Sequence, residues 1–112
     1  MFFNFFRQRS DNGFLKVLKA ADFKAAINIK NVQLIDVRTE NEFSSGHIEN
    51  AVNKNIFNSV LFENYINTLD KDQPVFLYCQ SGMRSKKAAR KMRSKGFKEV
   101  YDLQGGYGNW RG

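Results

Sequence analysis

The sequence predicts an α/β domain with a mostly parallel central sheet and helices on both of its faces. Short segments rich in β-branched and aromatic residues alternate along the chain with segments whose apolar residues recur at helical spacing. The joints between these segments are short, and strand–helix alternation with short joints is typical of parallel sheets. The length of 112 residues, 42% of them hydrophobic, suits one domain with a single core.

Five segments have the composition of strands. Residues 74–78 (PVFLY) form an almost uninterrupted apolar run, which is typical of a strand covered on both faces. Residues 32–37 (VQLIDV) are short and rich in β-branched side chains. The other expected strands are residues 14–18, 52–57 and 99–103.

Helices are expected between these strands. Phe23, Ala26 and Ile27 recur at helical spacing, and two later segments show the same pattern. The expected helices are residues 20–29, 59–69 and 84–95.

Two shorter helical segments complete the pattern. Thr39, with Glu42 three residues later, has the pattern of a capping box, which predicts that a helix begins there. Gly105 and Gly106 open a final turn or short helix that ends near Trp110.

Residues 1–13 are expected to form an N-terminal arm outside a single domain of residues 14–112. The chain opens with MFFNFF, but Asn4 interrupts the apolar run and the charges follow it, so the segment does not fit a signal peptide. A weak membrane contact is one interpretation of this arm, and we favour a frayed or docked terminus. No apolar run approaches the about 20 residues that span a bilayer.

Basic residues outnumber acidic ones by 18 to 11, and the net charge of +7 favours anionic partners. The densest basic cluster, between residues 84 and 98, is interpreted equally well as a solvated helix face or as a patch that steers anions or docks an acidic partner. No recognised nucleic-acid motif accompanies it, so nucleic acid is not an expected partner. The single cysteine excludes an intramolecular disulfide and a cysteine-rich zinc site. No metal or other cofactor is expected, and no oligomeric state is favoured.

The segment after the most apolar strand combines a nucleophile with an anion-binding geometry. Cys79 follows that strand directly, at the strand end where sites form in parallel sheets, and a helix begins at Arg84. The N–H groups of a helix N-terminus favour an anion, and Gly82 can adopt the positive φ that turns loop amides inward. We therefore expect Cys79 to be a thiolate nucleophile, open to solvent, in a ring of inward N–H groups. The anion-binding loop is expected to comprise Gln80, Ser81, Gly82, Met83, Arg84 and Ser85.

Each candidate residue also has a structural interpretation. Cys79 could be a small buried hydrophobe, but the spacing of glycine and arginine between a strand and a helix favours function. Arg38 could hold an anionic substrate, or Asp36 and Arg38 could pair and fix neighbouring loops, which we favour. His47 could be a general base, but a cysteine activated by amides needs none, so we favour a structural role in its turn.

The motif Cys79-x-x-Gly82-x-Arg84-Ser85 resembles the active-site loop of the rhodanese sulfurtransferases. The family's first signature is similar to Leu34-Ile35-Asp36-Val37-Arg38, Glu42, Phe43, Gly46-His47-Ile48 and Ala51. Its C-terminal pattern is similar to Gly96-Phe97, Val100-Tyr101, Leu103, Gly105-Gly106 and Trp110. One departure is Glu49-Asn50-Ala51, where the family usually has Pro-Gly-Ala. Asn50 tolerates the left-handed conformation, so we expect the turn to be retained.

The resemblance implies a rhodanese-like fold and a sulfurtransferase. Such an enzyme moves a sulfane sulfur from a small anionic donor such as thiosulfate to a thiophilic acceptor, cyanide or a thiol, through a persulfide on Cys79. Without a second cysteine, the persulfide cannot be resolved within the chain, so the acceptor, a thiol or protein acceptor included, must be external. Because such a thiol is prone to oxidation, a reducing compartment, the cytoplasm, is expected.

Two alternatives stay open. The first is a non-catalytic or persulfide-carrier module that serves a partner protein; inactive relatives often lack the cysteine, so Cys79 favours chemistry. The second and weaker alternative is a cysteine-dependent phosphatase or arsenate reductase. Protein tyrosine phosphatases place their arginine one residue farther from the cysteine, and the shorter loop here suits a sulfur atom better than a phosphoryl group.

Overall fold

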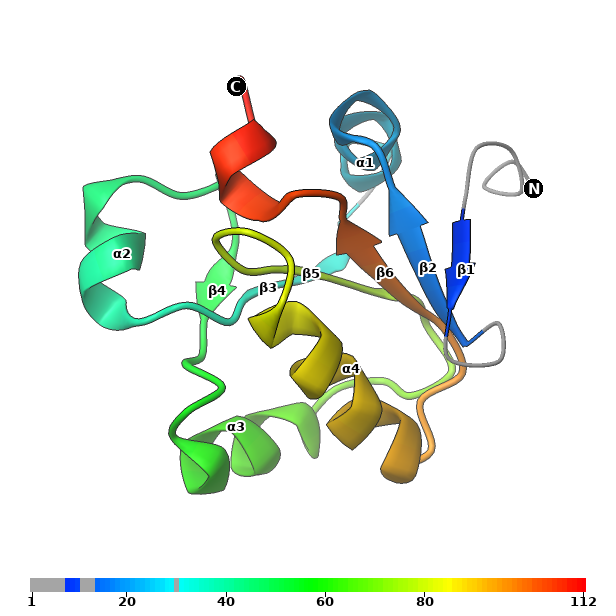
Figure 1. Ribbon diagram of the computed structural model, residues 1–112. Coiled ribbons are helices and arrows are strands. Elements are labelled where there is room, and N and C mark those ends of the chain that lie inside the picture. The colour runs from blue at the N-terminus through cyan, green and yellow to red at the C-terminus, as the bar shows by residue number, and fades with distance from the viewer. Residues whose placement is uncertain (1–7, 11–13, 30) are drawn as a thin grey trace.

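The central sheet has six strands, of which five are parallel (Figure 1). The structure is a computed structural model that describes residues 8–10, 14–29 and 31–112. The strands are β1 (Gln8–Ser10), β2 (Leu15–Leu18), β3 (Gln33–Asp36), β4 (Val52–Asn53), β5 (Val75–Tyr78) and β6 (Val100–Leu103). Their order is β1-β2-β6-β5-β3-β4, and only β1 runs antiparallel to its neighbour.

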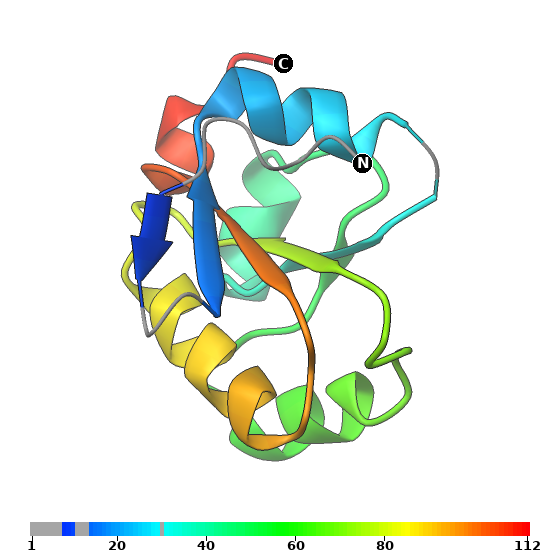
Figure 2. The same ribbon diagram turned by 90° about the vertical axis from the view of Figure 1, so that its right-hand side faces the viewer.

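Helices cover both faces of the sheet, which confirms the predicted fold class (Figures 1 and 2). They are α1 (Ala20–Ile27), α2 (Glu40–Ser45), α3 (Ser59–Ile66), α4 (Arg84–Ser94) and a final 3-10 helix, η2 (Gly106–Asn109). Phe62 of α3 and Met92 of α4 enter the core on one face. Phe23 of α1 enters the core on the other, with Tyr107 and Trp110 packed against it. Among the described residues, no helix is long and apolar enough to cross a bilayer.

Several predicted elements end earlier than expected. The strand predicted over residues 52–57 pairs only at Val52–Asn53, because the chain then turns and the Phe57 N–H bonds the side chain of Asn55. The helix predicted over 59–69 ends at Ile66, and the Leu69 N–H bonds the Ile66 carbonyl in a tight turn. The periodic apolar pattern continues through these turns, so it does not mark where the strand and the helix end.

Two local predictions about turns are confirmed. The capping box is formed, with the Thr39 side chain accepting from the Glu42 N–H and the Glu42 carboxylate accepting from the Thr39 N–H. Asn50 has φ +73°, the left-handed conformation that the turn requires.

Part of the predicted N-terminal arm lies on the edge of the sheet. Gln8–Ser10, which the sequence places in that arm, pair antiparallel with β2, as in a docked terminus. An edge strand held by backbone hydrogen bonds needs no apolar alternation, so the pattern contained no signal for it. Residues 1–7 and 11–13 lie outside the described residues, and the rest of the predicted arm stays a prediction.

Candidate active site

The loop that carries Cys79 lies where the carboxyl ends of β3 and β5 meet. The two strands are parallel neighbours, and beyond their last pair the Val37 N–H still bonds the Tyr78 carbonyl at 3.0 Å. Cys79 follows β5 directly, and α4 begins five residues later at Arg84. The predicted strand–loop–helix arrangement is therefore present, with the thiol at the strand end of the loop.

The loop directs one backbone donor at the sulfur. The Gly82 N–H donates to Cys79 Sγ at 3.0 Å, and Gly82 has φ +107°, the positive value expected for it. The Ser85 hydroxyl, in the first turn of α4, lies 3.5 Å from the same sulfur. The Gly82 N–H is therefore the donor that would stabilise negative charge on the sulfur, whereas the Ser85 hydroxyl donates to the Gly82 carbonyl and accepts from the thiol.

The expectation that the thiol is open to solvent is wrong, because Cys79 is only 1% exposed. β5 is buried along its whole length, and η2 packs against the loop that follows it. There the Tyr107 N–H bonds the Cys79 carbonyl at 2.8 Å and the Gly108 N–H bonds the Gln80 carbonyl at 3.0 Å. A second molecule reaches this sulfur only after the loop or its side chains move.

Arg84 does not point its guanidinium at the sulfur but at Glu42. Its Nη1 and Nη2 each donate to a different carboxylate oxygen of Glu42, both at 2.8 Å. This bidentate hydrogen bond from Arg84 lowers the pKa of Glu42 to about 2. The Arg84 guanidinium also lies 5.8 Å from the centre of the Phe57 ring. Sequence reasoning identified Glu42 only as a helix cap, because its arginine partner is 42 residues away.

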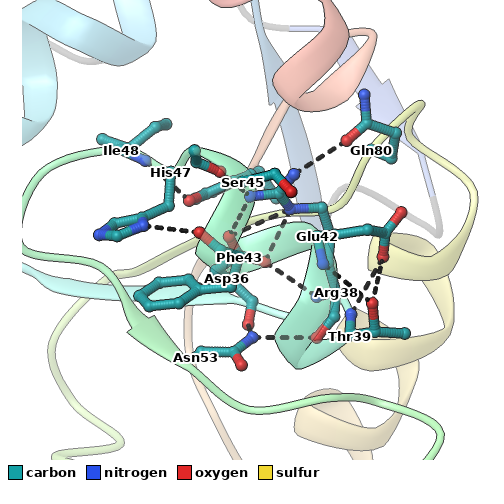
Figure 3. A network of polar contacts seen from close by, with 12 residues as sticks. Asp36, Arg38, Thr39, Glu42, Phe43, Ser45, His47, Ile48, Asn53 and Gln80 are labelled. Atoms are coloured by element: carbon teal, nitrogen blue, oxygen red, sulfur yellow. Dashed lines mark hydrogen bonds and ion pairs between the residues drawn. The ribbon is translucent and has the colours of Figure 1, made fainter.

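Asp36 and Arg38 form a buried ion pair beside the loop (Figure 3). Arg38 Nε and Nη2 donate to the Asp36 carboxylate at 2.7–3.1 Å. The remaining donors bond the Gly46 carbonyl at 2.6 Å and the Gln80 side chain at 2.9 Å. The guanidinium also lies 4.5 Å from the centre of the Tyr107 ring. These contacts join four segments and occupy the guanidinium, as the structural interpretation requires.

His47 lies on the turn after α2 and faces away from the loop (Figure 3). Its ring stacks on Phe43 with 3.7 Å between ring centres, and Nδ1 lies 2.8 Å from the Phe43 carbonyl. The side chain is exposed. This placement agrees with a structural role in the turn.

Sequence reasoning missed Asp102 and the contacts of Lys86. Asp102 is fully buried on β6, and its Oδ2 lies 3.3 Å from Lys86 Nζ. Burial raises the pKa of Asp102 to about 6. The available signal was an acidic residue inside the otherwise apolar strand pattern of residues 100–103 (VYDL). Within residues 8–10, 14–29 and 31–112, no three histidine, cysteine or acidic residues gather into a metal site.

Comparison with known proteins establishes the family. Residues 19–112 match the rhodanese-like domain, and the chain belongs to that family. The thiosulfate sulfurtransferase GlpE of Shewanella oneidensis is 38% identical over 81 residues, which are 72% of this chain and 77% of GlpE. At the level of the family, the chain is therefore a sulfurtransferase-like enzyme.

Two further relatives show the range of the family. The uncharacterized protein YqhL of Bacillus subtilis is 42% identical over 98 residues, 88% of this chain and 74% of YqhL. A rhodanese-like domain protein of Staphylococcus aureus superposes with a TM-score of 0.73 at 25% identity, covering 85% of this chain and 90% of the other. These likenesses confirm the resemblance and the fold that the sequence motifs indicated.

Proposed function

We propose that the protein is a sulfurtransferase that moves a sulfane sulfur from a donor such as thiosulfate to cyanide or a thiol through a Cys79 persulfide. The observation that carries the proposal is the Gly82 N–H directed at Cys79 Sγ, in a loop that ends at the N-terminus of α4. The similarity to thiosulfate sulfurtransferases supports the choice of donor.

The chemistry divides into two displacements. In the first, the Cys79 thiolate attacks the outer sulfur of thiosulfate, a new S–S bond forms, and sulfite leaves with the electron pair of the broken S–S bond. In the second, the acceptor attacks the terminal sulfur and the thiolate is restored. The Gly82 N–H stabilises the negative charge on the cysteine sulfur in both steps. Because Cys79 is buried, each step also requires the loop to open.

A second candidate function is delivery of the persulfide sulfur to a partner protein. The observation in its favour is an exposed apolar rim beside the loop, where Met83 is 80% and Phe57 64% exposed. The rim continues onto α3 with Val60 and Leu61, which are also exposed. Exposed apolar groups of this size next to a reactive centre are typical of protein contacts.

Incubation with thiosulfate followed by mass spectrometry of the intact protein tests the proposal. The expected result is a gain of one sulfur atom in the wild type and none in Cys79→Ser, since the chain has one cysteine. Addition of cyanide should then remove the sulfur and release thiocyanate. A wild-type protein that stays unmodified across thiosulfate, polysulfide and glutathione persulfide would overturn the proposal. Loading without release to cyanide would favour the carrier function.

Substitution Arg84→Ala is expected to weaken use of thiosulfate more than it weakens folding. The ion pair with Glu42 is partly exposed, so its loss costs about 1 kcal/mol or less. The change removes a positive charge from the loop that must receive an anion, so kcat/KM for thiosulfate should fall about tenfold. Arg90→Ala, which removes an exposed charge from the same helix, is the matched control. Unchanged kcat/KM together with a large drop in Tm would contradict the prediction.

A further inference from the structure

Asp102 is a buried carboxyl group that the proposed mechanism does not use. Its side chain is inaccessible to solvent, and Oδ1 has no hydrogen-bond partner among the described residues. Its register neighbours on the adjacent strands are Val17 and Leu77, both apolar. On the facing helix α4, the polar groups are the Ser85 hydroxyl and the Lys86 ammonium. Burying a carboxyl group with an unpartnered oxygen costs folding free energy, which indicates that Asp102 has a role other than stabilising the core.

Lys86 connects this carboxylate to the loop. Its ammonium donates to Asp102 Oδ2 at 3.3 Å and to the Gly82 carbonyl at 3.0 Å. The Ser85 hydroxyl also donates to the Gly82 carbonyl, at 3.2 Å. The Gly82 carbonyl is therefore held by two donors on the side of the loop where Asp102 lies.

The orientation of this carbonyl sets the direction of the N–H in the same peptide unit and restricts the residue that precedes it. In a trans peptide unit the C=O and the following N–H point in opposite directions. When Lys86 and Ser85 hold the Gly82 carbonyl, the N–H of Met83 is turned the opposite way. The same anchor limits rotation of Gly82, whose own N–H contacts the Cys79 sulfur.

We propose that Asp102 is a positioning residue that, through Lys86, holds the Gly82 carbonyl in place and so keeps the Gly82 N–H aimed at the Cys79 sulfur. The carboxylate fixes the lysine ammonium, which would otherwise extend into solvent, since the Lys86 side chain is partly exposed. The inference deepens the proposed function by naming what sets the shape of its loop. Its principal readout, however, does not require sulfur transfer.

A positioning role and a purely electrostatic role predict opposite results. If Asp102 acts on Cys79 only through its negative charge, it disfavours the thiolate, and Asp102→Asn would increase the thiolate fraction. If Asp102 positions the loop, the same change releases Lys86, loosens the Gly82 peptide and decreases the thiolate fraction. The sign of the change therefore separates the two roles.

The thiolate fraction of Cys79 at neutral pH, measured by ultraviolet absorbance, is the first experiment. Subtracting the spectrum of the matching Cys79→Ser protein isolates the signal of the single cysteine. Asp102→Asn and Lys86→Gln should each lower the fraction, and kcat/KM for thiosulfate should fall about tenfold. The double variant should be no worse than either single one, because both act through one contact. Lys87→Gln, an exposed neighbour on α4, is the control and should match the wild type.

The pH profile provides a second readout that a merely structural role would not change. Burial raises the pKa of Asp102 to about 6, so the anchor is formed above this pH and lost below it. In the wild type, kcat/KM should fall as the pH decreases through about 6, and this inflection should be absent from Asp102→Asn. Lys86→Gln, at a partly exposed position, keeps the test valid if Asp102→Asn does not fold.

A thiolate fraction that rises or stays the same in Asp102→Asn would overturn the positioning role, because Lys86→Gln removes a positive charge and lowers the fraction under either role. Failure of the proposed function has a different signature. In that case the wild type would not accept sulfur from any donor. The Cys79 thiolate fraction would nevertheless be lower in Asp102→Asn and Lys86→Gln than in the wild type.

Discussion

Substitution Gly106→Ala is expected to destabilise the fold by about 3 kcal/mol or more, because left-handed strain and overpacking each cost on the order of 1–3 kcal/mol. Gly106 has φ +66°, and a Cβ atom there would lie 2.6 Å from the Cys79 carbonyl oxygen and 2.5 Å from the Gln80 carbonyl carbon. These are backbone atoms of the loop that carries Cys79, so they cannot move aside without displacing the loop itself. Chemical denaturation measures the loss of stability.

Two other glycines separate the causes of that loss. Gly96 has φ +94° with open space around it, so Gly96→Ala reports the backbone strain alone. A Cβ atom at Gly108 would lie 3.3 Å from the Gln80 carbonyl oxygen, so Gly108→Ala reports a milder contact with the same loop. Gly106→Ala should cost more than either control. Equal costs for Gly106→Ala and Gly96→Ala would show that close packing on the loop contributes nothing.

Substitution Arg38→Met is expected to cost about 3–5 kcal/mol, because it leaves the Asp36 carboxylate buried without its partner. Removing the guanidinium also breaks its bonds to the Gly46 carbonyl and the Gln80 side chain. The free energy of unfolding in urea is the measurement. The candidate site should be affected as well, since Gln80 belongs to the loop that carries Cys79.

The matched control for Arg38→Met is a solvated ion pair. Lys98 and Asp72 lie 3.6 Å apart with side chains 67% and 77% exposed, so Lys98→Met should cost about 1 kcal/mol or less. The double variant Asp36→Leu/Arg38→Met removes both buried charges and should recover part of the loss. If Arg38→Met costs no more than Lys98→Met, burial is not what makes the first pair important.

The features that the sequence predicted are local or follow from periodicity. The apolar run before Cys79, the capping box at Thr39 and the left-handed Asn50 each depend on residues within a few positions of one another. The order of strand, loop and helix placed Cys79 at the carboxyl edge of the sheet, where the structure has it. These patterns were sufficient for the fold class and for the position of the candidate site.

The features that the sequence did not predict depend on contacts between distant segments. Arg84 pairs with Glu42 rather than pointing into its own loop, and Arg38 bonds Gln80 across a similar separation. The burial of Cys79 comes from packing around the loop, including the close approach of Gly106, which sequence reasoning interpreted only as part of a turn. Spacing along the chain does not encode such pairings, because they are set by the packing of the whole domain.

The burial of Cys79 affects how a bound sulfur atom would be handled. On the proposed function, a persulfide on Cys79 would be held behind its own loop and shielded from peroxide and from stray thiols while no acceptor is present. The rate of exchange with the surroundings then depends on how often the barrier in front of the sulfur moves, rather than on the strength of the attacking nucleophile. Such an arrangement suits storage and directed handover of sulfur more than indiscriminate scavenging.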